Sequence, residues 1–285
     1  MYSDLGRGTS IRFPSTANLM ISSQDRLNKP LGVPTGTSGK FNITSGQNVM
    51  TGYFSRMAPV EVVLDWQVYN VIGAVNSTFT VLTDADYTVS LDTGFYTVSS
   101  ALDTIISLLN TKIGSNAFSL TGTDGNKYFT GPAGWVLQPT QLSNQLFTFT
   151  SQPDPITNAI HVYNPILLTA VPAFIDFVCS NLTYQQGLKD ASTQSQIHDV
   201  LYRWYFAYDS PAPLDKYGYP IQMGYQPFNI RRYLSFPKQI KWNGDQPIGQ
   251  LQFEVYDQSG ALLSLPPGSG QGAFEWSMTL QISEV

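Results

Sequence analysis

Two segments near the C-terminus alternate strictly between apolar and polar residues, at positions 250–256 and 273–283. Successive side chains of an extended chain point to opposite faces of a sheet, so each segment has one apolar face and one polar face. The apolar side chains are Leu251, Phe253, Val255, Phe274, Trp276, Met278, Leu280 and Ile282. Strands of this pattern bury their apolar faces only against a second sheet. We therefore predict that these side chains share the core of a β-sandwich.

Other segments of the chain have the same character. Residues 60–68 place apolar side chains on one face, and residues 199–210 and 231–236 are also predicted strands. Asp257-Gln-Ser-Gly260 has the residues of a tight turn and predicts an antiparallel hairpin. Many long strands with long irregular connections favour a jelly-roll β-sandwich over a simple meander.

The middle of the chain differs from this pattern. Apolar residues recur at helical spacing over 98–114, where Thr97 or Ser99 can cap the start and Gly114 the end. Short β-like stretches follow at 117–120, 127–130 and 145–150. The predicted fold is therefore all-β: a jelly-roll β-sandwich with an inserted small β-α-β-β domain. The expected boundaries are 17–77 and 166–285 for the sandwich and 78–165 for the insert.

Residues 1–16 contain glycine, proline and few apolar groups. Such a segment does not offset its own ordering entropy by burial. We predict that it is an N-terminal arm that packs against another chain.

Charged residues make up only 12% of the chain, about half the usual share of roughly 25%. A surface rich in amides and hydroxyls favours close packing against neighbouring subunits. The alternative explanation is a β-rich surface dominated by Thr and Ser. The net charge of −5 argues against a surface that binds nucleic acid, because phosphate contacts require clustered Lys and Arg.

The sequence has no recognisable catalytic or metal-binding pattern. A nucleophilic site needs a cysteine or serine beside a histidine, but Cys179 lies in an apolar run and the two histidines, His161 and His198, are far apart. Their spacing matches no metal-site rule, and no phosphate-binding or dinucleotide motif is present. We predict no enzyme activity, no metal ion and no cofactor.

The densest aromatic tract, residues 202–208, is followed by further tyrosines and by basic residues. Aromatic rings interleaved with cations stack on bases or sugars in some proteins. Alternatively, alternate rings fill the sandwich core while the others meet a neighbouring subunit, since Tyr, Trp and Arg also anchor protein interfaces. We favour the second interpretation. The candidate interface residues are Tyr202, Trp204, Tyr217, Tyr219, Tyr225, Arg231 and Arg232.

Two stretches resemble a known family. Residues 87–114, YTVSLDTGFYTVSSALDTIISLLNTKIG, resemble a segment of capsid proteins of virophages and polinton-like viruses, in which a strand and a turn lead into an amphipathic helix. Residues 236–263, FPKQIKWNGDQPIGQLQFEVYDQSGALL, resemble the C-terminal strands of the penton, or minor capsid, proteins of these viruses. The resemblance implies a single jelly roll with an inserted domain, assembled as a pentamer at fivefold vertices, with no active-site residues to carry over.

The first functional hypothesis is a structural virion protein, a penton subunit that forms homopentamers and contacts the neighbouring major capsid protein. We expect it in the virion capsid. We also expect synthesis in the host cytoplasm, because the N-terminus lacks a signal-peptide pattern and no apolar run is long enough to span a membrane. The alternative hypothesis is a lectin-like or spike module that binds carbohydrate through exposed aromatic rings.

Overall fold

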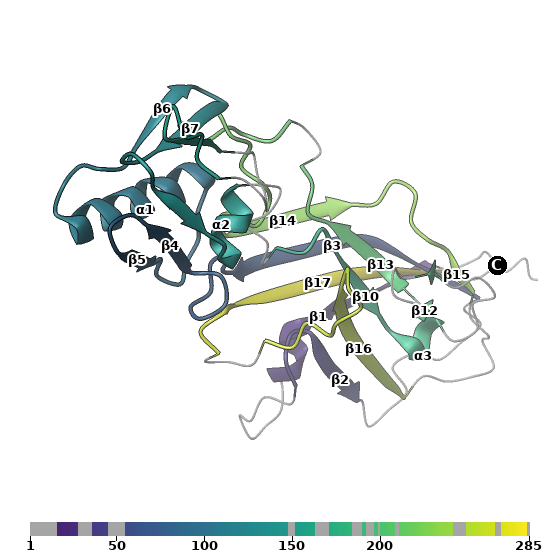
Figure 1. Ribbon diagram of the computed structural model, residues 1–285. Coiled ribbons are helices and arrows are strands. Elements are labelled where there is room, and N and C mark those ends of the chain that lie inside the picture. Colours follow the sequence, from purple (N-terminus) through teal and green to yellow (C-terminus); the bar gives the residue numbers. More distant parts are fainter. Residues whose placement is uncertain are drawn as a thin grey trace, which may run out of the picture.

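The computed structural model describes residues 16–27, 36–44, 55–147, 152–162, 171–183, 190–191, 197–198, 200–208, 211–241, 249–265 and 269–283. Long strands form a sandwich, and a smaller group of short strands and helices lies at one end of it (Figure 1). We call the smaller group the insert.

The sandwich contains two antiparallel sheets. The first has the order β1 (Thr16–Ser22), β17 (Gly272–Ser283), β3 (Arg56–Val68) and β14 (Phe228–Tyr233), with β15 (Ile240–Lys241) also paired to β3. The second has the order β13 (Val200–Tyr205), β10 (Phe174–Val178), β16 (Gln250–Asp257) and β2 (Lys40–Thr44). The remaining elements are the 3-10 helix η1 (Ser23–Leu27), the short helix α3 (Ser180–Thr183) and the pair β11 (Asp190–Ala191) and β12 (Ile197–His198).

The two alternating segments form β16 and β17, which belong to opposite sheets. All eight apolar side chains predicted for the core are at most 4% exposed and belong to one cluster between the sheets. Trp276 joins the layers: its ring centroid lies 5.5 Å from that of Phe253 and 4.9 Å from that of Phe177, and its indole Nε1 donates to the Ser38 carbonyl at 2.8 Å. The indole N–H group of Trp276 therefore has a hydrogen-bond partner inside the core.

The predicted turn after β16 is present. The Asp257 carboxylate accepts hydrogen bonds from the backbone N–H groups of Ser259 and Ala261 at 2.8 and 2.9 Å, and Gly260 has a φ of 79°. An Asp at the start and a residue with positive φ at the end are typical of such turns. The chain beyond it pairs back at the single bridge between Tyr256 and Leu262.

The insert has two small antiparallel sheets and two helices. The sheets have the orders β5 (Asp86–Ser90), β4 (Thr78–Leu82), β8 (Val136–Gln138) and β6 (Ser119–Thr123), β7 (Asn126–Thr130), β9 (Ala159–His161). The helices are α1 (Val98–Ile113) and α2 (Gln141–Leu146). Thr97 caps α1 in a capping box with Ser100, and Gly114 ends it in the left-handed region. The predicted fold class, a jelly-roll sandwich with a small inserted unit, is confirmed.

The prediction of a strand at 145–150 was wrong for the residues described. Gln145 and Leu146 end α2, which begins after Thr140, and residues 148–150 lie outside the described ranges. Thr140 and Ser143 form a second capping box, so side-chain bonds to the backbone outweigh the β-like composition.

The insert has its own hydrophobic core, but this core crosses the predicted boundaries of 78–165. It includes Val71, which precedes them, and Tyr219 and Tyr225, which follow them by more than fifty residues of chain. We call residues 211–225, which carry the two tyrosines, the strap. The boundary positions themselves remain a prediction.

Polar bonds also fix the strap on the insert. The Asp215 carboxylate accepts the backbone N–H of Ser99, in the first turn of α1, at 2.9 Å, and those of Tyr217 and Tyr219 at 2.9 and 3.0 Å. The Tyr219 hydroxyl accepts the Lys127 N–H at 3.1 Å and donates to the Val162 carbonyl at 3.2 Å. A carboxylate at a helix start satisfies free N–H groups and complements the helix dipole.

Candidate assembly surface

The two sheets meet along one flank through their edge strands, β13 and β14. We call this flank the seam. The Arg232 guanidinium on β14 donates to the carbonyls of Tyr205 and Ala207 at 3.2 and 2.8 Å, and the Lys238 ammonium donates to the Val200 carbonyl at 2.8 Å. An edge strand otherwise presents its carbonyls to any chain that could pair with it. The two cations therefore cover acceptors at both ends of β13.

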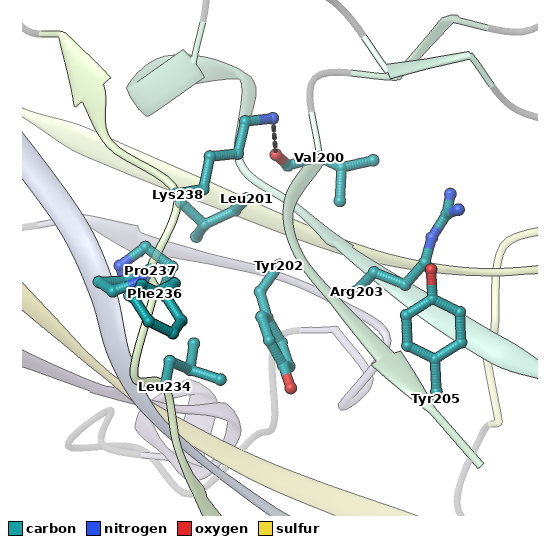
Figure 2. Close-up of a pocket in the computed structure, with 10 residues that line it drawn as sticks. Val200, Leu201, Tyr202, Arg203, Tyr205, Leu234, Phe236, Pro237 and Lys238 are labelled. Carbon is teal, nitrogen blue, oxygen red and sulfur yellow. Dashed lines mark hydrogen bonds between the residues drawn. The ribbon is translucent and has the colours of Figure 1, made fainter. Parts of the chain in front are cut away.

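A pocket of about 300 Å³ opens at the seam. Its lining residues are Pro59, Val200, Leu201, Tyr202, Arg203, Tyr205, Leu234, Phe236, Pro237 and Lys238. Figure 2 shows Tyr202 between the side formed by Leu234 and Phe236 and the side formed by Arg203 and Tyr205. The lining is mostly apolar and aromatic, with cationic groups at its edge, which is the composition of a protein contact surface.

Two aromatic rings that line this pocket are unusually exposed: Phe236 is 99% exposed and Tyr205 53%. Tyr233, at the end of β14, is 68% exposed. Single exposed apolar side chains are ordinary, whereas a group of large ones at one place marks a contact site. The seam is therefore the part of the sandwich that is best suited to meet another molecule.

Two guanidinium groups hold rings at or near the seam in place. The Arg203 guanidinium forms two bonds to the nearly buried Asp176 carboxylate, at 2.6 and 2.7 Å, and lies 3.9 Å from the Phe174 ring centroid. The Arg231 guanidinium bonds Glu61 at 2.7 Å and lies 4.7 Å from the Tyr233 centroid. Hydrogen bonds to these carboxylates raise the pKa of both arginines. Both groups therefore stay cationic, and the Arg231 guanidinium packs against the Tyr233 ring.

The structure separates the predicted interface residues into two sets. Tyr202 lines the seam pocket, Arg231 and Arg232 lie on β14, and Tyr217 is half-buried on the insert. The expectation of contact with a neighbour must be corrected for Trp204, Tyr219 and Tyr225, which are at most 2% exposed. The physical reason is packing: Trp204 faces the sandwich core, whereas the two tyrosines fill the core of the insert.

Tyr205, Tyr233 and Phe236 were not among the interface residues predicted from the sequence. Tyr205 lies on the opposite face of β13 from Trp204, but aromatic residues of the tract 202–208 fall on both faces, so alternation did not identify the exposed one. Nothing in the sequence identified Phe236 as exposed. It lies beyond the end of β14, where the alternation stops.

Cys179, His161 and His198, the candidates for nucleophilic catalysis or metal binding, are not among the residues that line the seam pocket. Cys179 is fully buried, and burial raises the pKa of its thiol to about 12, so it is not a nucleophile at neutral pH. His161 Nε2 lies 2.6 Å from Asn126 Oδ1 on the insert, and the side chain of His198 is outside the described part of the chain. Within the described ranges, no three His, Cys, Asp or Glu side chains gather closely enough to hold a metal ion. No described helix is both long and apolar enough to cross a membrane.

Comparison with known proteins gives structural matches alone. No protein-family model and no curated protein matches the chain. It is similar to a chain in the cryo-EM structure of the Sputnik virophage, with a TM-score of 0.50 and 12% identity over 95% of this chain and 98% of that chain. It is also similar to the mavirus penton protein in its crystal structure, with a TM-score of 0.47 and 12% identity over 96% and 100% of the two chains. Over nearly its whole length, the chain therefore shares its fold with a chain of the Sputnik virophage structure.

Proposed function

We propose that this chain is a structural capsid protein, a penton (minor capsid) subunit that forms homopentamers at the vertices of an icosahedral virion and contacts the major capsid protein there. The observation that carries this proposal is the fold shared, over nearly both chains, with a chain of a virophage particle. The sequence resemblance of residues 87–114 and 236–263 to capsid and penton proteins of such viruses points the same way.

The surface chemistry supports a role in assembly. Charged residues are few, and the seam exposes Tyr205, Tyr233 and Phe236 beside a mainly apolar pocket. Exposed aromatic rings on a preordered surface are the residues that contribute most to protein interfaces. The proposal also places the protein in the virion, after synthesis in the host cytoplasm. It includes the packing of the predicted N-terminal arm, residues 1–16, against a neighbouring chain; residues 1–15 lie outside the described part of the chain, and Thr16 itself pairs with Ser283.

We assign the protein no catalytic residue, metal ion or cofactor, because the role proposed here is association. The alternative hypothesis of a carbohydrate-binding module is less well supported. Sugar binding needs exposed aromatic rings, and three of the candidate rings, Trp204, Tyr219 and Tyr225, are buried, which leaves fewer rings such as Tyr205 to contact a sugar.

The experiment is to measure the mass of the purified chain by native mass spectrometry and sedimentation, and to image the assemblies by electron microscopy. A penton subunit should form closed rings of five copies. Glycan-array binding by a chain that stays monomeric, dimeric or trimeric would instead support the carbohydrate-binding alternative and reject the proposal.

A further inference from the structure

In the two sheets of the sandwich and the segments that directly adjoin their edge strands, the exposed large apolar side chains lie at two places. Among the described residues, one group is at the seam, and the other consists of Met20 on β1 and Leu27 at the end of η1, which are 77% and 48% exposed. β1 and β14 are the opposite edges of the first sheet, and they lie on opposite flanks in Figure 1. Each flank of the sandwich therefore has its own apolar group.

These two groups lie at the same level of the sheet. Met20 is opposite Thr279 on β17, Thr279 is opposite Glu61 on β3, and Glu61 is opposite Tyr233 on β14. Residues directly opposite each other in antiparallel strands point to the same face. Met20 and Tyr233 are thus the two ends of one row on the outer face of the sheet, separated by three strand spacings, or about 14 Å.

A closed ring of identical subunits requires two different surfaces that complement each other, because each copy meets its two neighbours through opposite sides. We propose that Met20 of one copy packs against Tyr233 of the next, so that the β1 edge of each sandwich contacts the seam of its neighbour. This inference rests on the homopentamer of the proposed function and names its contact. When the copies in a ring are related by rotation about an axis perpendicular to this row, Met20 of one copy and Tyr233 of the next lie at the same height along that axis. The two side chains can then meet at the subunit boundary.

The chemistry of the two sides fits this contact. Methionine is unbranched and polarisable and forms favourable contacts between its sulfur and aromatic rings. Tyr233 is already held by Arg231, which is itself bonded to Glu61, so little side-chain freedom is lost when a partner arrives. Arg232 and Lys238 already donate hydrogen bonds to backbone carbonyls at the β13 edge of the seam. We therefore expect the neighbouring copy to contact β13 through side chains, and not to pair a strand of its own with it.

Cross-linking tests the contact directly. We would prepare Met20→Cys, Tyr233→Cys and the double variant in the full chain and treat each with a short bismaleimide. The native Cys179 is fully buried, so it contributes little background. The double variant should give a ladder of covalent oligomers up to the pentamer, and an equimolar mixture of the two single variants should give dimers alone. Each single variant by itself should give none.

The matched control pairs Tyr233→Cys with Ile156→Cys, since Ile156 is 87% exposed but belongs to the insert. Because all these positions are on the surface, circular dichroism should show unchanged folding. In a second measurement, Met20→Ala should raise the dissociation constant of the pentamer by roughly tenfold or more, because it removes the side chain that packs against Tyr233.

The outcomes separate the two proposals. Pentamers that form without a ladder in the double variant, or cross-linked dimers of Tyr233→Cys alone, would overturn the contact and leave the penton proposal intact. A chain that forms no pentamers at all would reject the proposed function, and this inference with it.

Discussion

The sandwich core and the core of the insert differ in how the sequence supplies their side chains. In the sandwich, alternate residues of long strands such as β16 and β17 face the opposite sheet. In the insert, one face of α1 and several short strands enclose side chains that come from segments far apart, including Val71 and the strap residues Tyr219 and Tyr225. The first core follows from local periodicity, whereas the second depends on contacts between distant parts of the chain.

The core of an inserted segment can thus include side chains from outside the segment. The strap lies between β13 and β14 of the sandwich in sequence, yet its side chains are part of the core of the insert. Its Asp215 also bonds the first turn of α1. Loss of the strap contacts should therefore destabilise the insert, whereas loss of a strand contact in the sandwich should destabilise the whole protein.

The largest expected effect is in the sandwich. Trp276→Ala or Phe253→Ala should lower the free energy of unfolding by about 3 to 5 kcal/mol, because each leaves a cavity between the sheets. Gln252→Ala, on the opposite face of β16, is the control and should change stability by less than about 1 kcal/mol. Urea denaturation measures these changes. If Phe253→Ala left folding intact but abolished assembly, the inner and outer faces of β16 would be assigned the wrong way round.

The next effect is in the insert. Tyr219→Ala should cost about 3 kcal/mol by removing a buried ring, and Tyr219→Phe about 1 to 2 kcal/mol by removing the hydroxyl that bonds Lys127 and Val162. Hydrogen exchange should become faster in α1 and β7 while β16 and β17 stay protected. An equal increase in exchange throughout the molecule would show that the two cores unfold as one unit.

A smaller effect should come from Asp215→Ala. The substitution removes the acceptor of three backbone N–H groups, including that of Ser99 in α1, and should cost about 1 to 2 kcal/mol. Asp215→Asn keeps one side-chain oxygen and should cost less. Hydrogen exchange of the first turn of α1 measures the effect directly, and unchanged protection in Asp215→Ala would mean that the strap does not stabilise the helix start.

The smallest effect concerns the outer face of the second sheet. Burial alone would raise the pKa of Glu254, but hydrogen bonds from Lys40 and Tyr256 outweigh it, and the pKa is lowered. A carboxylate whose pKa is lowered by folding stabilises the protein above its unfolded value of about 4.3 and loses this contribution as the pH falls. Glu254→Gln should therefore reduce the loss of melting temperature on acidification. If the melting temperatures of Glu254→Gln and the unsubstituted protein fell equally with decreasing pH, the stabilising role of the Glu254 carboxylate would be wrong.

The sequence predicted the burial of some side chains correctly but not that of others. Alternation predicted the burial of Phe253 and Trp276, because a strand packed on one side needs an apolar residue at every second position. In the tract 202–208 every position is aromatic, basic or small, so alternation could not distinguish the buried Trp204 from the exposed Tyr205. The short helix α2 was missed because its capping box lies in a segment of β-like composition.

Apolar alternation predicted β3, β13, β14, β16 and β17, and helical spacing with capping residues predicted α1, because these signals act within one element; β2 and β10 of the sandwich were not predicted. Only the folded chain reveals that Tyr219 and Tyr225 complete the core of the insert, and that Met20 and Tyr233 are the two ends of one row of the sheet. The physical reason is that strand order and loop docking depend on contacts between residues far apart in the chain. Such contacts leave no period in the sequence, so the arrangement of the surfaces could be known only from the fold.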